Sequence, residues 1–251
     1  MSQSHTFIVI VGATSAIAEH CARQWLHQGP VRLLLVGRSK ERTDSIAADL
    51  RIRSPLSRIE TMAGDFETAE SIARLVQEAT ALETPDIALI AHGALPDQQA
   101  CQHDLLQTQT AIHLNAVSPV LFAEAFAGGM ERAGKGTLGI IGSVAGDRGR
   151  KSNYVYGAAK ALVERYAEGL QHRLASTRVR VVLIKPGPTD TPMTAHLKSM
   201  GMPLADPAVV AGAIVRGMAR GRWVVYAPTK WALVMLLMRH LPRFVFHRLN
   251  I

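Results

Sequence analysis

The sequence predicts an α/β fold built on a doubly wound parallel sheet, and two observations carry this prediction. Short runs rich in aliphatic and β-branched residues alternate with longer segments of helical periodicity, which is the pattern of βαβ units. The runs are also apolar at successive positions, as expected for strands that helices cover on both faces. Because ligands of such sheets bind beyond the carboxyl ends of the strands, we expect functional residues there. The predicted strands are Phe7 to Val11, Val31 to Val36, Ile87 to Ala91, Thr137 to Ile141 and Val179 to Ile184.

Length and composition fit one domain. The 251 residues contain no Ser/Gly/Pro-rich linker, repeat or low-complexity tract, so we expect residues 1–251 to form a single Rossmann-like domain. The hydrophobic fraction of 48% and the charged fraction of 19% are those of a globular protein. No Lys or Arg precedes the apolar run at Phe7, which argues against a signal peptide and predicts a cytoplasmic protein. Cys21 and Cys101 show no metal-ligand spacing and cannot form a disulfide framework.

The net charge of +8 does not indicate a nucleic-acid-binding protein, because of how the charge is distributed. Residues Pro207 to Ile251 include seven Lys or Arg and no Asp or Glu, which leaves the rest of the chain almost neutral. A groove that follows a phosphate backbone would need basic residues spread along it. We therefore expect no nucleic-acid partner.

A glycine turn follows the first predicted strand and leads into a helix that contains Glu19 to His27. Backbone amides at such a turn, together with the start of the helix, can bind the pyrophosphate of a dinucleotide. Taken alone, the segment is equally compatible with an ordinary βα turn. The candidate cofactor-binding residues are Gly12, Thr14, Ser15, Ala16 and Ile17.

The end of the second predicted strand favours NADP(H) over NAD(H). NAD-selective members of this fold place an acidic residue there to hold the ribose 2′-hydroxyl, and this sequence has none. Gly37 would leave room for a 2′-phosphate, Arg38 could pair with it, and Ser39 is a further donor at the start of the next helix. The alternative is that Arg38 is only a solvated charge.

Three side chains form a candidate catalytic set. Ser143 lies at the end of a predicted strand, and Tyr156 and Lys160 are one helical turn apart further along the chain. A cation close to the tyrosine is expected to lower its pKa, so that Tyr156 can exchange a proton with substrate while Ser143 orients a carbonyl oxygen. Tyr-x-x-x-Lys alone also occurs in surface helices, and the preceding serine favours catalysis. Tyr154 is not a candidate, because Ala158 and not a lysine stands four residues later.

Together these residues resemble the short-chain dehydrogenases/reductases, over roughly the first four-fifths of the chain. The family's Gly-x-x-x-Gly-x-Gly turn keeps only Gly12 here, since Ala16 and Ala18 replace the other glycines. The resemblance implies that hydride moves between a nicotinamide carbon and a substrate carbon, and that Lys160 also binds the nicotinamide ribose. It further implies that residues 190–207 form a mobile substrate lid.

The resemblance also assigns roles to isolated residues. Asn115 matches an asparagine of the central helix that helps to hold a water relay leading to the catalytic lysine. His92 departs from the family's asparagine, and we interpret it as a loop histidine with its ring turned aside. The other implied cofactor contacts are Asp65 and Phe66 at the adenine, Ala91 and Gly93 beside the adenine ribose, and Pro186, Gly187 and Thr191 over the nicotinamide, in addition to Tyr156 and Lys160.

From Gly142 onward the chain is similar to one branch of this family, the decaprenylphosphoryl-2-keto-ribose reductases. The similarity implies a keto sugar joined through phosphate to a polyprenyl chain, a separate flavin oxidase that makes the ketone, and a phosphate contact for His196 and Lys198. Alternatives are a reductase of another apolar ketone, steroid-like or acyl, a generic reductase, and a non-catalytic NADP-sensing protein. A homo-oligomer is expected by analogy. The similar segments are Ser143 to Arg148, Asn153 to Gly157, Met193 to Lys198, and Arg239 to Arg243 with Phe246 and Leu249.

Residues 230–251 predict a C-terminal apolar and basic helical extension. Trp231 to Met238 is apolar on every helical face but far shorter than the roughly 20 residues that span a bilayer. Pro242 then ends this helix or begins another, which carries Phe244 and Arg248. One interpretation is a peripheral contact with anionic lipid on the inner face of the membrane. The other is packing on the sheet or across a subunit interface.

Overall fold

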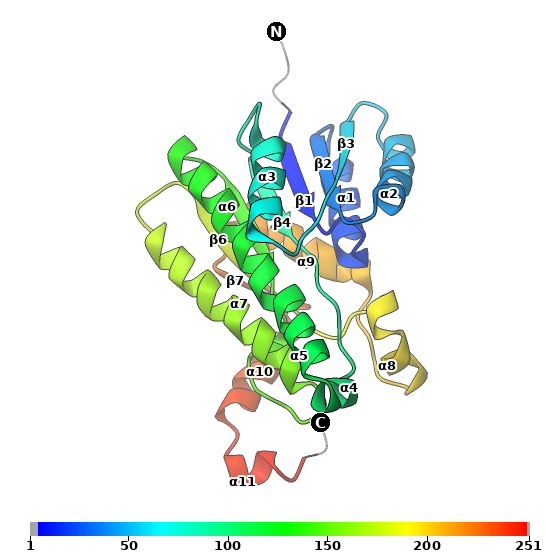
Figure 1. The fold of residues 1–251 in the computed structure, drawn as a ribbon, viewed down its shortest axis with the longest axis vertical. Helices are drawn as coiled ribbons and strands as arrows, with labels where there is room; N and C mark the ends of the chain where they lie inside the picture. Colours follow the sequence, from blue (N-terminus) through cyan, green and yellow to red (C-terminus); the bar gives the residue numbers. More distant parts are fainter. Residues whose placement is uncertain (1–4, 250–251) are drawn as a thin grey trace.

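The computed structural model describes residues 5–249, and its centre is a sheet of seven parallel strands (Figure 1). The strand order is β3-β2-β1-β4-β5-β6-β7, so the chain winds outward from β1 in one direction and then from β4 in the other. The predicted doubly wound parallel sheet is confirmed. The strands are β1 (Phe7–Val11), β2 (Arg32–Gly37), β3 (Arg58–Ala63), β4 (Ile87–Ile90), β5 (Thr137–Ile141), β6 (Arg180–Pro186) and β7 (Val224–Ala227).

The sequence patterns place five of these strands to within two residues, but they give no bounds for β3 and do not predict β7. This edge strand has four residues, of which Val224 is exposed and Tyr226 partly exposed. Because β7 has little apolar surface to bury on its outer side, it lacks the continuous apolar run that marks the inner strands.

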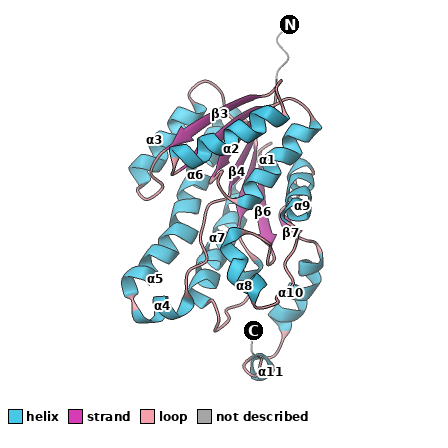
Figure 2. Ribbon diagram, turned by 90° about the vertical axis from the view of Figure 1, so that its right-hand side faces the viewer, coloured by secondary structure: helices cyan, strands magenta, loops and turns pink. Residues whose placement is uncertain are grey.

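Helices cover both faces of the sheet (Figure 2). Three helices pack on one face and three on the other, as the two hydrophobic clusters show. The first group is α1 (Ala16–Gln28), α2 (Lys40–Arg53) and α9 (Pro207–Ala219), and the second is α3 (Ala69–Thr80), α6 (Ser118–Ala133) and α7 (Tyr154–Arg173).

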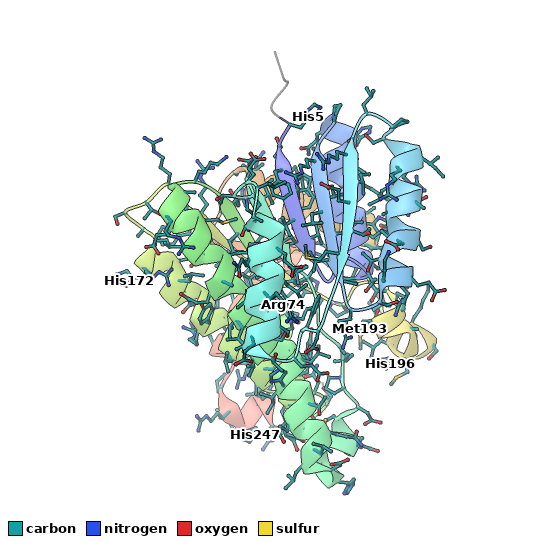
Figure 3. All side chains as sticks on the ribbon, turned by 45° about the horizontal axis from the view of Figure 1, so that its top comes forward. His5, Arg74, His172, Met193, His196 and His247 are labelled. Atoms are coloured by element: carbon teal, nitrogen blue, oxygen red, sulfur yellow. The ribbon has the colours of Figure 1, made fainter. Side chains whose placement is uncertain are left out.

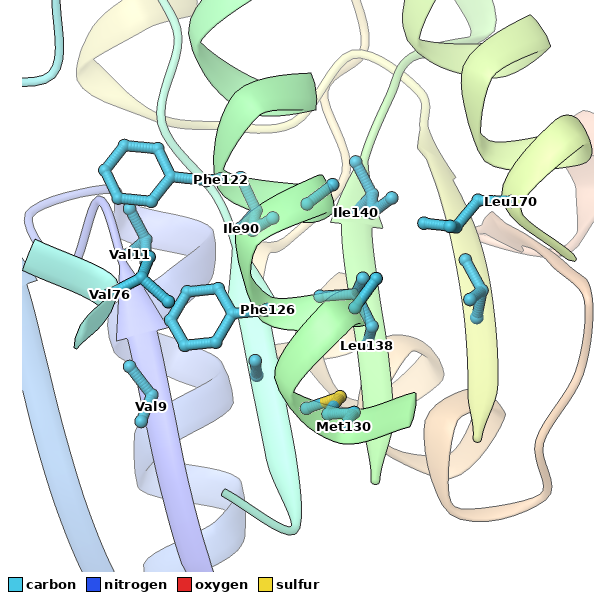
Figure 4. Close-up of a cluster of buried hydrophobic side chains, with 14 of the residues drawn as sticks. Val9, Val11, Val76, Ile90, Phe122, Phe126, Met130, Leu138, Ile140 and Leu170 are labelled. Atoms are coloured by element: carbon cyan, nitrogen blue, oxygen red, sulfur yellow. The ribbon is translucent and has the colours of Figure 1, made fainter. Parts of the chain in front are cut away.

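The side chains of β1 alternate between the two layers. Val9 and Val11 belong to the cluster beneath α3, α6 and α7, whereas Ile8 and Ile10 belong to the cluster beneath α1 and α9. Burying a large apolar side chain contributes about 1.5–3 kcal/mol, so both faces of an inner strand favour apolar residues. Figure 4 shows the first cluster, which extends from the β1 valines across the sheet and includes Val76, Ile90, Phe122, Phe126, Met130, Leu138, Ile140 and Leu170.

A long helical stretch leads into the second layer. After α4 (Gln98–His103), α5 (Leu105–Ile112) continues through a π-helical turn (His113–Val117) into α6. By length and composition, Leu105–Ala133 could cross a membrane, but half of the apolar window is buried inside the protein. A core helix of this fold gives the same signal, so the stretch does not indicate a membrane span.

The C-terminal extension comprises α10 (Lys230–His240) and α11 (Arg243–Phe246), at the bottom of Figure 1. α10 packs beside β7 and buries Met235, while Leu233, Leu236 and Leu237 are exposed. Packing on the body of the protein therefore accounts for one face of α10 only. Residues 250 and 251 of the predicted extension lie outside the described residues.

Candidate active site

The candidate catalytic residues meet at the carboxyl ends of β4 and β5. Ser143 follows β5 and precedes a short 3-10 turn (Val144–Gly146), where its Oγ accepts a hydrogen bond from Ala145 N at 3.1 Å. Tyr156 lies in the first turn of α7 and its hydroxyl is hydrogen-bonded to Ser143. The turn after β5 thus holds the serine against the tyrosine, as the sequence spacing predicts.

Lys160 is buried, with 3% of its surface exposed. Its Nζ donates to Ile141 O at 3.0 Å and lies 5.8 Å from the centroid of the Tyr156 ring. Burial lowers the pKa of Lys160 to about 8, because the charged ammonium loses solvation. The lysine ammonium therefore lies beside the tyrosine ring.

Burial also has the largest effect on Tyr156. It raises the pKa of the hydroxyl above its usual value, and the hydrogen bond to Ser143 acts in the opposite direction. The lowering expected from Lys160 is not among the causes of the shift. Tyr156 is therefore protonated throughout the neutral pH range, as a proton donor needs to be.

Asn115 is fully buried in the π-helical turn between α5 and α6. Its Nδ2 donates to Ala111 O, and its Oδ1 accepts from Ala94 N, both at 2.9 Å. A Cβ built on Gly93 would lie 2.8 Å from Asn115 Oδ1 and 3.5 Å from Lys160 Nζ. The asparagine and the lysine are therefore neighbours, and π-helical turns of this kind are frequent at functional sites.

The glycine turn after β1 fits a dinucleotide pyrophosphate. Gly12 has φ +80°, and a Cβ there would lie 2.6 to 2.8 Å from His92, so only glycine suits this approach of two strand ends. Ser15 precedes α1 without capping it, which leaves the first amides of that helix for a ligand. Ala18 is buried in the core, whereas the candidate residues Thr14, Ser15, Ala16 and Ile17 are partly exposed.

At the end of β2 the structure corrects one expectation. Gly37 does not leave open space for a phosphate, because a Cβ there would lie 2.1 Å from Oγ1 of the fully buried Thr43. Ser39 caps α2 by accepting from Arg42 N. Arg38 is exposed at the surface beside this cap, and no ion pair among residues 5–249 engages it. The glycine thus serves helix packing, and the arginine remains the phosphate candidate.

His92 is more buried than a loop histidine would be. Its ring packs edge-on against Phe66 and Phe122, and Nε2 lies 2.9 Å from Ser118 Oγ. Burial lowers its pKa to about 3, so the ring is neutral. The ring is turned into the core beneath α6. Its neighbour Ala91 is buried as well.

Asp65 and Phe66 occupy different environments. Asp65 is exposed, and its carboxylate accepts from Glu67 N at 3.0 Å, which is the turn geometry of a local aspartate. Phe66 is buried against His92, which leaves only its backbone for the adenine contact that the resemblance implies.

Residues 6–201 match the family model of the short chain dehydrogenases. The chain belongs to this family. It is 33% identical over 245 residues to an uncharacterized oxidoreductase of Mycobacterium tuberculosis, with 96% of each chain covered. An uncharacterized oxidoreductase of Streptomyces coelicolor is 29% identical over 242 residues, with 96% of this chain and 95% of that one covered. The protein is therefore an oxidoreductase that interconverts CH-OH and C=O groups with NAD(P).

Solved structures support the same fold. A short-chain dehydrogenase from Sphingobium yanoikuyae in complex with NADPH has a TM-score of 0.80 at 24% identity, covering 94% of this chain and 96% of the other. One from Burkholderia cenocepacia in complex with NADP has a TM-score of 0.81 at 20% identity, covering 99% of both chains.

In this short-chain dehydrogenase the loop after β6 is contacted by the C-terminal extension. A Cβ on Gly187 would lie 1.9 Å from Nε1 of Trp231, so the indole of α10 covers the glycine directly. Gly187 N in turn donates to Ala227 O at 3.0 Å, which continues the pairing of β6, ending at Pro186, with β7. Sequence patterns do not reveal this contact.

The lid segment, residues 190–207, contains a 3-10 turn (Pro192–Thr194) and α8 (Ala195–Ser199). Thr191 forms a capping box with Thr194, and Asp190 N and Pro188 O pair with Ala205, so both ends of the segment are tied together. His196 is exposed (Figure 3), and Lys198 is ion-paired with Asp190.

A buried ionic cluster beside the site was not predicted. Lys185, 1% exposed at the end of β6, has its Nζ 2.6 Å from Asp147 Oδ1 and 2.7 Å from Glu164 Oε1. Tyr226 OH lies 3.3 Å from the Asp147 carboxylate, and Arg239 Nη1 of α10 lies 3.8 Å from it. One sequence feature could have indicated this cluster. A lysine ends an otherwise apolar strand, and a charge buried there needs a partner of opposite charge.

Arg148 connects the loop that follows Ser143 to the C-terminal extension. Its Nη1 donates to Met238 O and, at 2.6 Å, to Leu241 O, and its guanidinium lies 3.9 Å from the centroid of the Phe246 ring. The extension is therefore fixed to both the loop that follows Ser143 and the loop that contains Gly187.

Proposed function

We propose that the enzyme reduces a ketone to a secondary alcohol with NADPH. The observation that carries the proposal is the contact of the Tyr156 hydroxyl with Ser143 above the buried Lys160 ammonium. Both hydroxyls can donate to one carbonyl oxygen, and Tyr156 then passes its proton to the alkoxide that forms there. Bound NADPH would supply the hydride. The Lys160 ammonium stabilises the phenolate left behind, and Asn115 lies where it can help to return a proton.

The residues proposed to hold the cofactor lie along the strand ends. They are Gly12, Thr14, Ser15, Ala16 and Ile17 at the pyrophosphate, Arg38 and Ser39 at the 2′-phosphate, Asp65, Phe66, Ala91 and Gly93 at the adenosine, and Tyr156, Lys160, Pro186, Gly187 and Thr191 at the nicotinamide.

The test of catalysis is substrate-dependent oxidation of NADPH. We expect it to disappear in Tyr156→Phe, which removes the proton donor and little else, while the variant keeps its NADPH affinity. A wild-type protein that binds NADPH but oxidises none with any ketone would instead support the non-catalytic sensing function.

The preference for NADP(H) rests on Arg38, which is exposed at the end of β2 where no carboxylate is available for a ribose hydroxyl. Comparing kcat/KM with NADPH and with NADH tests this preference. A clear advantage for NADH would contradict it.

For the substrate we propose a keto sugar joined through phosphate to a polyprenyl chain, made by a separate flavin oxidase. The support is the similarity of the segments around Ser143, Tyr156 and the lid to the keto-ribose reductases. Lys198 would exchange its ion pair with Asp190 for the substrate phosphate. If Lys198→Ala weakens binding of a phosphorylated substrate no more than that of a neutral ketone, this assignment fails. Faster reduction of steroid-like or acyl ketones would favour the alternative substrate class.

A peripheral membrane contact follows from a lipid-linked substrate. Leu233, Leu237 and Phe244 of the extension are 64%, 65% and 69% exposed, and Arg243 and Arg248 of the same extension are exposed as well. Exposed apolar residues flanked by cations suit the surface of anionic lipid. We expect salt-sensitive flotation with anionic vesicles that is lost when the chain is cut before Lys230. Equal flotation of the folded full-length and truncated proteins would reject the contact.

A further inference from the structure

The buried ionic cluster connects three segments that meet at the candidate active site. Lys185 is the penultimate residue of β6, and its Nζ lies 2.6 Å from Oδ1 of Asp147 and 2.7 Å from Oε1 of Glu164. Asp147 ends the turn that begins at Ser143, and Glu164 belongs to α7. A single ammonium therefore joins the turn of the candidate catalytic serine to the helix of the candidate catalytic tyrosine.

Glu164 lies on the same face of α7 as the candidate catalytic residues. It follows Tyr156 by eight residues and Lys160 by four, so the three side chains share one stripe over two helical turns. Lys160 and Glu164 are both buried, at 3% and 6% exposure. The bond from Lys185 to Glu164 consequently fixes the end of β6 to that face of the helix.

The turn from Ser143 to Asp147 lies directly against α7. A Cβ built on Gly146 would lie 2.9 Å from the backbone carbonyl carbon of Lys160. One built on Gly157 would lie 2.9 Å from the carbonyl oxygen of the turn's second alanine-side neighbour, residue 145. Because the two backbones are in contact, any movement of the turn has to follow the surface of the helix. The ion pair at Asp147 opposes such a movement.

Stability alone does not account for this cluster. Burial by itself would lower the pKa of Lys185, but the bonds to Asp147 and Glu164 outweigh it and raise the pKa above its usual value, so the lysine is charged. The side chain of Asp147 has no exposed surface. A buried ion pair is often no more stable than well-packed apolar residues of the same size. The cluster differs from such residues in the fixed geometry that its bonds impose.

We propose that Lys185 is a positioning residue for the reaction. Its bonds to Asp147 and Glu164 hold the turn in one place along α7. They thereby set the position of the Ser143 hydroxyl relative to that of Tyr156. An error of about 1 Å in such an alignment can lower a rate about 100-fold. The inference rests on the proposed roles of the serine and the tyrosine in ketone reduction.

The test is a double-mutant cycle in the full-length enzyme with NADPH. Lys185→Met removes the bridge and keeps most of the side-chain volume. We expect it to lower kcat about 10- to 100-fold, while KM for NADPH changes less than about threefold. In a Ser143→Ala background the same substitution should lower kcat less than about threefold, because there is no hydroxyl left to misplace. An equal loss in both backgrounds would show a merely structural role and overturn the proposal.

The probe is the fastest substrate among cyclohexanone, 2-octanone and dihydrotestosterone. Single-turnover oxidation of NADPH with the enzyme in excess keeps the slow Ser143→Ala variants measurable. Leu170→Ala is the stability control, since it opens a cavity at a buried position of α7 outside the ionic cluster. It should lower the urea midpoint and leave kcat within about twofold.

A second variant separates geometry from charge. Combining Lys185→Met with Asp147→Asn removes one charge of each sign, and Glu164 keeps its ion pair with Arg165. This double variant also serves if Lys185→Met alone does not fold. It lacks the bridge too, so we expect the same loss of kcat. A return to the wild-type value would show that only the unbalanced charge was harmful, and it would overturn the proposal.

Hydrogen exchange tests the position of the turn without turnover. The amides of Ala145 and Gly146 donate to Oγ and O of Ser143, both at 3.1 Å, so they report whether the turn is held. Exchange in the peptide that covers residues 143–148 should be about tenfold faster in Lys185→Met than in Leu170→Ala. Equal exchange in the two variants would overturn the proposal. If the wild-type enzyme reduces none of the three ketones, the proposed function fails, and the exchange rates alone then test whether Lys185 holds the turn.

Discussion

The catalytic end and the phosphate end of the candidate site are built differently. At the catalytic end, Lys160 and Asn115 are buried, and each is held by hydrogen bonds to backbone atoms. At the phosphate end, Thr14 to Ile17 are partly exposed and Arg38 is exposed. The protein therefore fixes side chains at one end and backbone conformation at the other. This difference explains why Ala16 and Ala18 can stand where the family's turn has glycines, whereas the catalytic serine, tyrosine and lysine are the same residues as in the family.

The largest effect should come from the catalytic end. Lys160→Met is expected to lower kcat by about 10²- to 10⁴-fold, because the ammonium that supports proton transfer is lost. The same variant should be more stable than the wild type at pH 7, by on the order of 1–3 kcal/mol, since it no longer buries a charge. Turnover and urea unfolding measure the two effects, with Lys151→Met at an exposed site as the control.

The pH dependence of that stability gain sharpens the test. Burial lowers the pKa of Lys160 from its usual 10.5 to about 8, so between these values the unfolded chain binds a proton that the folded protein lacks. Wild-type stability at this site is therefore lowest below pH 8 and rises with pH up to about 10.5. The advantage of the methionine variant should shrink over that window. An advantage that stays constant from pH 7 to 10 would contradict burial of the charge.

At the phosphate end, the backbone itself should be the sensitive feature. Gly12→Ala places a methyl group at φ +80° and against His92, and we expect it to lower the free energy of unfolding by about 2–4 kcal/mol. Gly169→Ala is the matched control, because this helical glycine is exposed and a Cβ there meets nothing within 4 Å. The control should gain about 0.5–1 kcal/mol. Similar changes in the free energy of unfolding in both variants would show that the backbone at Gly12 has no special requirement for glycine.

A smaller and more selective effect is expected at Arg38. Arg38→Ala should lower kcat/KM for NADPH about 10- to 100-fold and leave the value for NADH within about twofold, because only NADPH carries the 2′-phosphate. Arg53→Ala, at the opposite end of α2, removes the same charge and should alter neither value. Parallel losses with both cofactors at Arg38 would indicate a structural role.

The smallest effect concerns the extension. Arg148→Met removes the bonds to Met238 O and Leu241 O, so we expect a loss of about 1 kcal/mol or less and faster tryptic cleavage after Arg239 and Arg243. Arg132→Met at an exposed site should leave the cleavage rate unchanged. Unchanged cleavage in Arg148→Met would show that the other contacts of α10, among them those of Trp231 and Met235, are enough to fix it.

Local patterns predict the inner strands because these must be apolar on both faces, and they predict the catalytic set because Tyr156 and Lys160 share one helical turn. The Lys185–Asp147–Glu164 cluster could not be predicted in this way, since its members lie far apart in the sequence and meet only when β6, α7 and the loop after Ser143 pack together. Gly37 shows the opposite case. The local sequence pattern at Gly37 predicted space for a ligand, but the side chain of Thr43 occupies that space.

The π-helical turn at Asn115 also changes the phase of the long helix that contains it. One extra residue in a turn rotates all preceding side chains by about 100° relative to those that follow. The stripe that α5 presents to α7 is therefore out of step with the stripe that α6 presents to the sheet. Deleting a single residue from His113–Val117 would bring the two stripes into line as one regular helix. Asn115 would then lose the alignment with Ala94 N that places it beside the catalytic lysine.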